Sequence, residues 1–126
     1  MANWMITGVS NGLGRALAQA VLAEGDSVVG TCRRDADCAA FEALAPGRAF
    51  AVILDVSDHG AAAGAVAAAE KVVGQIDTLV NNAGYGMVGA IEETSIAEAK
   101  ALFDVNLWGA MAMIQAVLPA MRARRR

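Results

Sequence analysis

The stretch Thr7-Gly8-Val9-Ser10-Asn11-Gly12-Leu13-Gly14 constrains the fold of this chain more than any other. It follows the short apolar run 4–6 and precedes an Ala- and Leu-rich helical pattern, so we predict a strand, a glycine turn and a helix. In such a turn Gly8 lets the chain reverse off the strand, Gly12 lets a pyrophosphate approach the backbone, and Gly14 lets the helix pack close to the sheet. The helix start would offer free N–H groups and the positive end of its dipole to phosphates.

A tight turn without any ligand is the competing interpretation of this stretch, because a glycine-rich turn after a strand can be purely conformational. The spacing T-G-x-x-x-G-x-G and the strand–helix context favour phosphate binding. A phosphate loop of the Walker kind is excluded, since no Gly-Lys-Ser/Thr follows the glycines.

Strand and helix patterns alternate along the whole chain. The predicted strands are residues 4–6, 27–32, 49–54 and 76–80, and the predicted helices end near 24 and cover 35–44, 60–74, 95–103 and 105–121. Strands separated by helices form parallel sheets with right-handed crossovers and helices on both faces. We therefore predict one domain over residues 1–126, an α/β fold with a three-layer, doubly wound, Rossmann-like parallel sheet truncated after about four strands.

Two details refine this prediction. The strand 49–54 is apolar throughout, which is typical of a strand buried on both faces of a parallel sheet. Ser95 with Glu98 three residues later forms a capping box that predicts a helix start.

Charge and hydropathy limit the classes of partner. The net charge is −3, but Arg122, Arg124, Arg125 and Arg126 are four of the ten basic residues, so residues 1–121 hold six basic and 13 acidic side chains, a net charge of −7. Residues 1–121 are too acidic to favour binding to a nucleic-acid backbone. The terminal arginines suit a helix C-terminus, where positive charges oppose the helix dipole. No apolar run approaches the ~20 residues of a membrane span, and Met1-Ala2-Asn3 leads straight into the first strand. We expect a soluble cytoplasmic protein without nucleic-acid or membrane partners.

The cysteines and the single histidine give no sign of a metal site. Cys32 and Cys38 have no second pair and no nearby histidine, so we expect two free thiols and no zinc. His59 lies beside Gly60 at a predicted helix start, where a surface or capping role is the favoured interpretation.

Polar residues follow all four predicted strands, where a doubly wound sheet binds its ligands. Each has an ordinary alternative explanation, because Asp and Asn form turns and an arginine pair is usually solvated. These strand-end groups are the glycine turn after the first strand, Arg33-Arg34 after the second, Asp55 after the third and Asn81-Asn82 after the fourth.

The order and spacing of these motifs resemble the short-chain dehydrogenase/reductase family over essentially the whole chain. The matching motifs are Thr7-Gly8-x-x-x-Gly12-x-Gly14, Asp55-Val56, Asn81-Asn82-Ala83-Gly84 and Asn106 within Asp104-Val105-Asn106-Leu107-Trp108-Gly109. The resemblance implies that Asp55 hydrogen-bonds the adenine amino group, that Asn82-Ala83-Gly84 lines the cofactor pocket, and that Asn106 holds a water in the proton relay of the active site. The residues expected to bind cofactor are Gly8, Ser10, Asn11, Gly12, Leu13, Gly14, Arg33, Arg34, Asp55, Val56, Asn82, Ala83 and Gly84.

The end of the second strand indicates which dinucleotide is preferred. A carboxylate there accepts from the 2′-hydroxyl of NAD and repels the 2′-phosphate of NADP. This chain has Cys32 and then Arg33, with no carboxylate before Asp35. A guanidinium suits a phosphate by charge and by its forked donors, so we predict NADP(H) over NAD(H), with Arg33 as the first phosphate contact and Arg34 as the second.

The chain departs from the family pattern in its catalytic residues. The family's Tyr-x-x-x-Lys pair lies beyond the Asn-bearing helix, whereas Tyr85 is the only tyrosine here and Gly89 stands where its lysine should be. The resemblance therefore covers the amino-terminal half of an NADP(H)-dependent oxidoreductase that transfers hydride between the nicotinamide and a small carbonyl compound or secondary alcohol. We predict that this half alone is inactive. The alternatives are a non-catalytic nucleotide-binding module and a self-associating fragment.

Self-association is expected from two features. In the strand order that the resemblance implies, the strand carrying Leu79-Val80 would lack its neighbour, and unpaired apolar edges invite pairing with another chain. The last helix carries an apolar stripe that needs a partner surface, formed by Leu107, Met111, Ile114, Leu118 and Met121. We predict a homo-oligomer.

Overall fold

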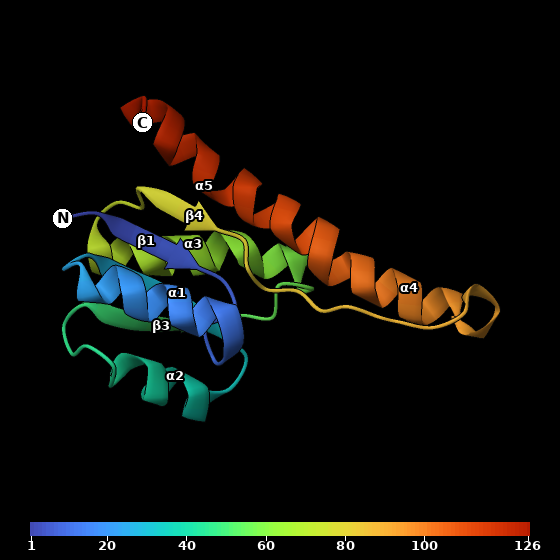
Figure 1. Cartoon of the computed structure of the whole chain (residues 1–126). Helices are drawn as coiled ribbons and strands as arrows, with labels where there is room; N and C mark the ends of the chain where they lie inside the picture. Colours follow the sequence, from blue (N-terminus) through green and yellow to red (C-terminus); the bar gives the residue numbers. More distant parts are fainter.

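Strands and helices alternate in the computed structural model, which describes all residues 1–126 (Figure 1). The strands are β1 (Asn3–Ile6), β2 (Ser27–Cys32), β3 (Ala49–Ile53) and β4 (Thr78–Val80). The helices are α1 (Gly12–Ala23), α2 (Asp35–Glu42), α3 (Ala62–Val73), α4 (Ile96–Phe103) and α5 (Ala110–Arg124), with 3-10 turns η1 (His59–Ala61) and η2 (Ile91–Glu93) and a π turn η3 (Asp104–Gly109). The predicted elements are all present, with boundaries within a few residues.

All four strands are parallel and lie in the order β3-β2-β1-β4. Met5 on β1 pairs with Val29 on β2 and with Leu79 on β4, so β1 and β2 are the central strands. The chain crosses from β3 to the far side of β1 before forming β4, which creates the switch in strand order of a doubly wound fold. The predicted fold class is confirmed.

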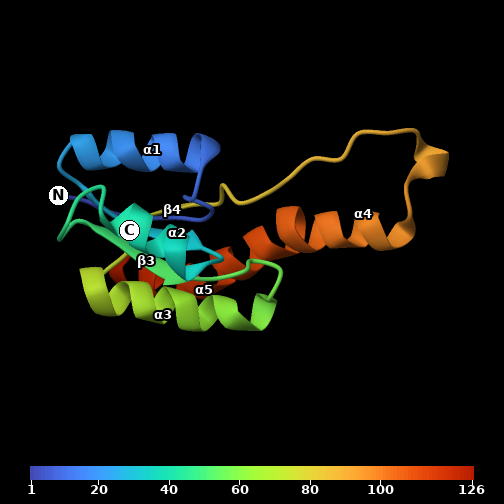
Figure 2. The ribbon, with the colours of Figure 1, turned by 90° about the horizontal axis from the view of Figure 1, so that it is seen from below.

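Two apolar cores lie on opposite faces of the sheet and give the three layers (Figure 2). Helices α1 and α2 cover one face through Ala18, Val21, Leu22 and Phe41. Helices α3 and α5 cover the other face through Ala62, Ala65, Val66, Ala69, Met113 and Val117. Short side chains on α3 bring this helix close to the sheet, as the alanine-rich sequence suggests.

The strand predicted at 49–54 is covered on both faces, but it is only partly buried. Ala49 and Ala51 pack in the core under α1 and α2, and Phe50 and Val52 pack against the core under α3 and α5. β3 is an edge strand, and Ile53 at its end is 52% exposed. The strand in which every residue is buried is β2, which includes the polar residues Ser27 and Thr31. Unbroken apolarity therefore did not distinguish an edge strand from a central one.

The two helices predicted at the end of the chain form one continuous helix, Ile96–Arg124, which the π turn η3 interrupts without breaking. The capping box at its start is present, since Ser95 Oγ accepts from the Glu98 N–H at 3.1 Å and Glu98 Oε2 accepts from the Ser95 N–H at 3.1 Å. Figures 1 and 2 show α4 extending beyond the sheet. By length and composition alone this 29-residue helix is apolar enough to cross a membrane. The sequence analysis missed this because it divided the helix in two.

The buried face of α5 differs from the predicted apolar stripe. Met113 and Val117 are buried against the sheet, and Met121 packs at the margin of the same core. Leu107, Met111 and Ile114 point outward and are 43–47% exposed. Most of the predicted stripe is thus a surface of the isolated chain.

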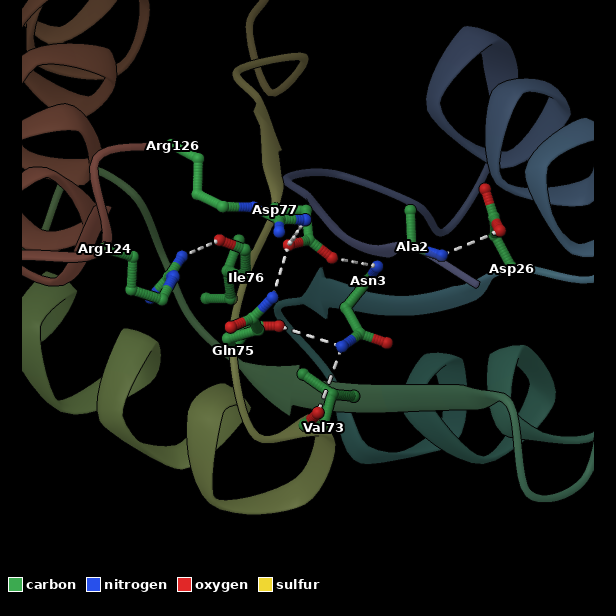
Figure 3. A network of polar contacts seen from close by, with 9 residues as sticks. All are labelled: Ala2, Asn3, Asp26, Val73, Gln75, Ile76, Asp77, Arg124 and Arg126. Carbon is green, nitrogen blue, oxygen red and sulfur yellow. Dashed lines mark hydrogen bonds and ion pairs between the residues drawn. The ribbon is translucent and has the colours of Figure 1, made fainter. Parts of the chain in front are cut away.

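The amino ends of the strands are joined by a polar network (Figure 3). Asn3 Nδ2 donates to the carbonyls of Val73 and Gln75, both at 3.0 Å, and the Asn3 N–H donates to Asp77 at 2.9 Å. Arg124, in the last turn of α5, donates to the carbonyl of Ile76. The basic residues at the end of α5 therefore sit at a helix C-terminus, as predicted.

Candidate cofactor site

A cleft of about 640 Å³ opens at the carboxyl ends of the four strands. Its size is within the range of small-molecule sites. Sixteen residues line it: Gly8, Ser10, Asn11, Gly12, Leu13, Thr31, Cys32, Arg33, Leu54, Asp55, Val56, Asn82, Ala83, Gly84, Tyr85 and Val105. The parallel sheet brings residues more than 70 positions apart in sequence to one wall.

The glycine turn between β1 and α1 forms one side of this cleft. Gly8 and Gly12 have φ angles of 71° and 61°, in the left-handed region that favours glycine. No side chain caps the first turn of α1, and that turn holds no acidic residue. Its N–H groups and the positive end of the helix dipole therefore face the cleft without a competing negative charge, which suits an anion.

Gly14 and Asn82 hold the glycine turn against the end of β4. A Cβ on Gly14 would collide with the Gly8 carbonyl oxygen and the Asn82 amide nitrogen, so Gly14 acts through close packing and does not line the cleft. Asn82 Nδ2 donates to the carbonyls of Thr7 at 3.1 Å and Gly8 at 3.0 Å. Thr7 Oγ1 accepts from the N–H groups of Asn82 and Ala83, each at 3.0 Å. The strand-end asparagine is thus a structural clamp for the turn.

Asp55 stands at the carboxyl end of β3 on the opposite wall. The Ser57 hydroxyl donates to its Oδ1 at 2.7 Å and the Ser57 N–H donates to the same atom at 3.0 Å. These two hydrogen bonds lower the pKa of Asp55 below its ordinary value, and the positive charge of Arg33 adds to the effect. Asp55 is therefore a carboxylate at neutral pH and can accept a hydrogen bond from a ligand.

The two arginines after β2 lie in different environments. Arg33 lines the cleft and makes no hydrogen bond or ion pair within the chain. Arg34 turns away from the cleft and pairs with Asp37, with Nε and Oδ2 2.9 Å apart, while its side chain stays 77% exposed. The structure therefore supports Arg33 at the cleft and does not bring Arg34 to it.

Cys32 forms part of the cleft floor. It is almost fully buried, and burial raises the pKa of its thiol. Burial and the neighbouring Cys32 raise the pKa of Cys38 to about 11. Both cysteines are free thiols that stay protonated at neutral pH.

Asn106 lies just outside the cleft and fixes part of its rim. Its Oδ1 accepts from the Tyr85 N–H at 3.0 Å, and its Nδ2 donates to the Tyr85 carbonyl at 2.7 Å. This side chain thus holds the loop after β4 against the π turn. Its neighbour Val105 and the tyrosine that it holds both line the cleft.

The sequence analysis missed five lining residues: Thr31, Cys32, Leu54, Tyr85 and Val105. Thr31 and Leu54 lie at or just after strand ends, so the rule that located Asp55 could have found them. Thr31 Oγ1 also accepts from the Gly8 N–H at 3.1 Å. Tyr85 and Val105 are brought to the cleft by the hydrogen bonds between Asn106 and the Tyr85 backbone. These bonds join residues 21 positions apart, so no local sequence pattern predicts them.

Comparison with known proteins agrees with this geometry. Residues 3–126 match the sequence profile of the short chain dehydrogenase family. Oxidoreductase BOA17 of Botryotinia fuckeliana is 37% identical over 123 residues, which cover 97% of this chain and 45% of that protein. The NADPH-dependent 3-dehydrocapnine reductase of Ornithobacterium rhinotracheale is 34% identical over 116 residues, which cover 90% of this chain and 41% of that protein.

The fold is also similar to solved structures. The crystal structure of a short-chain dehydrogenase from Streptomyces avermitilis superposes with a TM-score of 0.92 at 42% identity, covering 98% of this chain and 45% of that one. The chain thus spans less than half the length of each of these three relatives. The family profile covers nearly every residue, and the glycine turn and the strand-end residues of its motifs surround one cleft: the chain belongs to the short chain dehydrogenase family.

Proposed function

We propose that residues 1–126 are the cofactor-binding half of an NADP(H)-dependent oxidoreductase that transfers hydride to or from a carbonyl compound or secondary alcohol. Membership of the family supports use of a nicotinamide dinucleotide. The preference for NADP(H) rests on one observation: Arg33, without any partner in the chain, lines the cleft beside the end of β2, where no carboxylate precedes Asp35. The relative named as NADPH-dependent is consistent with this preference.

The residues that line the cleft fit a dinucleotide in three places. The uncapped start of α1 and the turn from Gly8 to Gly12 would hold the pyrophosphate. Arg33 would contact the 2′-phosphate, and the Asp55 carboxylate would accept from the adenine amino group. Asn82-Ala83-Gly84 and Val56 would line the remaining wall. Gly14 contributes by letting α1 approach the sheet, and Arg34 is a second, weaker candidate for the phosphate because Asp37 already holds it.

Arg33→Ala tests the cofactor preference, with Arg34→Ala as the matched control. Loss of a charge-assisted contact should weaken NADPH binding roughly tenfold or more and leave NADH binding unchanged. Arg34→Ala should have a much smaller effect. Isothermal titration of both dinucleotides against the three proteins measures this. Equal losses for NADPH and NADH in Arg33→Ala would refute the assignment.

We propose further that the chain of 126 residues has no turnover by itself. Carbonyl reduction needs a proton donor within hydrogen-bond reach of the oxygen, and loss of such a donor typically costs ~10²–10⁴ in rate. Tyr85 has no lysine four residues later, because position 89 is glycine. Asn106 would hold a water of the proton relay, and an amide cannot replace the missing acid.

NADPH oxidation with a panel of aldehydes and ketones tests this proposal. The 126-residue chain should show no rate above background, and a longer chain carrying a downstream Tyr-x-x-x-Lys should show turnover. Comparable rates would mean that the catalytic acid lies within residues 1–126. Dinucleotide binding without turnover by the longer chain would favour a non-catalytic nucleotide-binding module.

We also propose that the chain is a homo-oligomer. The outer edge of β4 has no neighbouring strand, and five apolar side chains on α4, η3 and α5 are 43–52% exposed: Phe103, Leu107, Trp108, Met111 and Ile114. Exposed apolar patches and open strand edges both favour association. Light scattering over a wide concentration range should give a mass above that of the monomer, and a monomer mass throughout would refute this.

We expect the protein to be cytoplasmic. We also expect it to bind no nucleic acid, because the first 121 residues carry a net charge of −7. Cell fractionation and a DNA-binding titration at low salt test these two expectations. The fractionation includes the membrane fraction, because Ile96–Arg124 is long and apolar enough to cross a membrane.

A further inference from the structure

The π turn η3 stands out because it interrupts an otherwise regular helix of 29 residues. π turns are rare, and they are frequently found at functional sites. This one contains Asn106, which holds the rim of the cleft, and Val105, which lines it. The register of the helix at η3 therefore determines whether Val105 lines the cleft and whether Asn106 reaches the Tyr85 backbone.

Two contacts hold the π turn against the body of the protein on the cleft side. Asn106 bonds both backbone groups of Tyr85. Gly109, at the end of the turn, packs so closely on Val56 that a Cβ would lie 2.9 Å from the Val56 carbonyl oxygen. These contacts fix the middle and the end of the turn.

The beginning of the turn is held by His59. Its Nε2 lies 2.8 Å from the carbonyl oxygen of Asp104, the first residue of η3. A carbonyl oxygen only accepts, so Nε2 carries the proton and donates. His59 lies in η1, directly before α3, whose residues Ala62 and Val66 are buried in the core. Figure 2 shows the start of α3 beside the point where α4 passes into α5.

A change from π to α register would displace the residues that matter. Successive residues of an α-helix are rotated by about 100°, so removing the extra residue of a π turn would rotate one side of the helix relative to the other. Since α5 is fixed by Met113 and Val117 in the core, the rotation would fall on residues at and before η3. Asn106 would then no longer face the Tyr85 backbone.

We propose that His59 is a positioning residue that holds helix Ile96–Arg124 in its π register at η3. It acts through Asp104 on Asn106, and through Asn106 on the Tyr85 loop at the rim of the cleft. The expected effect of His59 on cofactor binding rests on the proposed function, whereas its effect on the register of the π turn is independent of that function.

The two tryptophans of the chain provide a local test. Trp108 lies within η3, and Trp4 lies on β1, where its indole donates to Asp26 at the other end of the sheet. With 5-fluorotryptophan incorporated, the chain should give two fluorine NMR signals, which a Trp4→Phe variant assigns. The Trp4 signal then serves as an internal control for global unfolding.

Three substitutions of His59 separate positioning from a general surface role. His59→Ala should shift or broaden the Trp108 signal and leave the Trp4 signal unchanged. His59→Gln should restore the original Trp108 signal, because the glutamine amide nitrogen can occupy the place of Nε2. His59→Asn should not restore that signal, because its side chain is too short to reach the Asp104 carbonyl. An unchanged Trp108 signal in His59→Ala, equal shifts of both signals, or a failure of Gln to restore the signal would overturn the proposal.

Dinucleotide titration of the same variants measures the consequence at the cleft. His59→Ala should weaken NADPH binding between about twofold and tenfold, which corresponds to the loss of one hydrogen bond, and His59→Gln should recover it. If the unsubstituted chain binds no dinucleotide, the proposed function fails while the fluorine signals still decide the role of His59. If NADPH binds equally well to all variants although the Trp108 signal moves, the link from the π turn to the cleft is wrong.

Discussion

Both ends of the sheet are rich in polar residues, but these residues are bonded within the chain at the amino ends and in part left without partners at the carboxyl ends. At the amino ends, Asn3 and Asp77 are bonded to Val73, Gln75 and each other (Figure 3). At the carboxyl ends, Arg33 has no partner and the start of α1 has no cap. Bonds within the chain stabilise the fold, whereas groups without a partner are left for another molecule. A polar group at a strand end that has no partner in the chain is therefore stronger evidence of a binding site than polarity alone.

This comparison leads to a separable expectation for mutations. Changes at the amino ends should lower the free energy of unfolding and leave dinucleotide affinity unchanged. Changes to groups without a partner at the carboxyl ends should weaken dinucleotide binding and leave the free energy of unfolding unchanged. Gly14 and Asn82 are the exceptions, because they build the cleft through packing and hydrogen bonds of their own.

The largest effect is expected for Gly14→Ala, which should lower the free energy of unfolding by about 1–3 kcal/mol, as overpacking does, and abolish dinucleotide binding. The added methyl group meets the Gly8 carbonyl and the Asn82 amide, neither of which can move without disturbing β1 or β4. Urea denaturation and NADPH titration measure the two losses.

Gly64→Ala is the matched control for this substitution. Gly64 lies inside α3 with open space around its Cα, so alanine there should raise the free energy of unfolding by roughly 0.5–1 kcal/mol. If both alanines stabilised the protein, close packing of α1 on the glycine turn would not be the reason for Gly14.

Asn3→Ala tests the amino end of the sheet and should lower the free energy of unfolding by about 1–3 kcal/mol. It removes two hydrogen bonds, to the carbonyls of Val73 and Gln75, each worth about 0.5–1.5 kcal/mol net. NADPH affinity should not change, because this network lies at the end of the sheet opposite the cleft. Arg33→Ala should give the mirror-image result, lost affinity with unchanged stability, and a variant that lost both would break the comparison.

Much of the fold could be predicted because its signals are local. Apolar runs bounded by glycines located β1, β2 and their connecting helix, and the parallel topology then placed Arg33 and Asp55 at one edge. The edge position of β3 could not be predicted, because strand order is decided by packing between distant segments.

The rest of the site depended on contacts that sequence patterns do not reveal. The helices predicted at 95–103 and 105–121 correspond to α4 and α5, but the sequence patterns did not show that the π turn around Asn106 joins them into one continuous helix. Arg34 could have been separated from Arg33 beforehand, since Asp37 lies three residues later, within reach of an ion pair on the same turn.

Acid sensitivity should differ between the two ends, and Asp26→Asn tests the amino end. The Ala2 N–H donates to Asp26 at 2.9 Å, and this bond, followed by that of the Trp4 indole, lowers the pKa of Asp26 in the folded protein. A lowered folded pKa gives stability that is present above the unfolded value of about 3.9 and is lost as pH falls through the folded pKa. Urea midpoints measured from pH 6 downward should therefore decline less steeply in Asp26→Asn than in the unsubstituted chain below about pH 4. Parallel declines would show that these contacts persist in the unfolded chain.

Asp55→Asn at the carboxyl end should have the smallest effect on stability. The pKa of Asp55 is also lowered, by the Ser57 hydroxyl and N–H and then by Arg33, so its contribution has the same sign and is lost in the same direction with falling pH. However, Ser57 is only two residues away, and such local turns persist in part in unfolded chains, which brings the folded and unfolded pKa values closer together. An asparagine Oδ1 can accept the same two bonds, so the urea midpoint and its decline in acid should both stay close to those of the unsubstituted chain. A loss as large as that of Asn3→Ala would mean that Asp55 is part of the folding framework, and the contrast between the two ends of the sheet would not extend to this wall of the cleft.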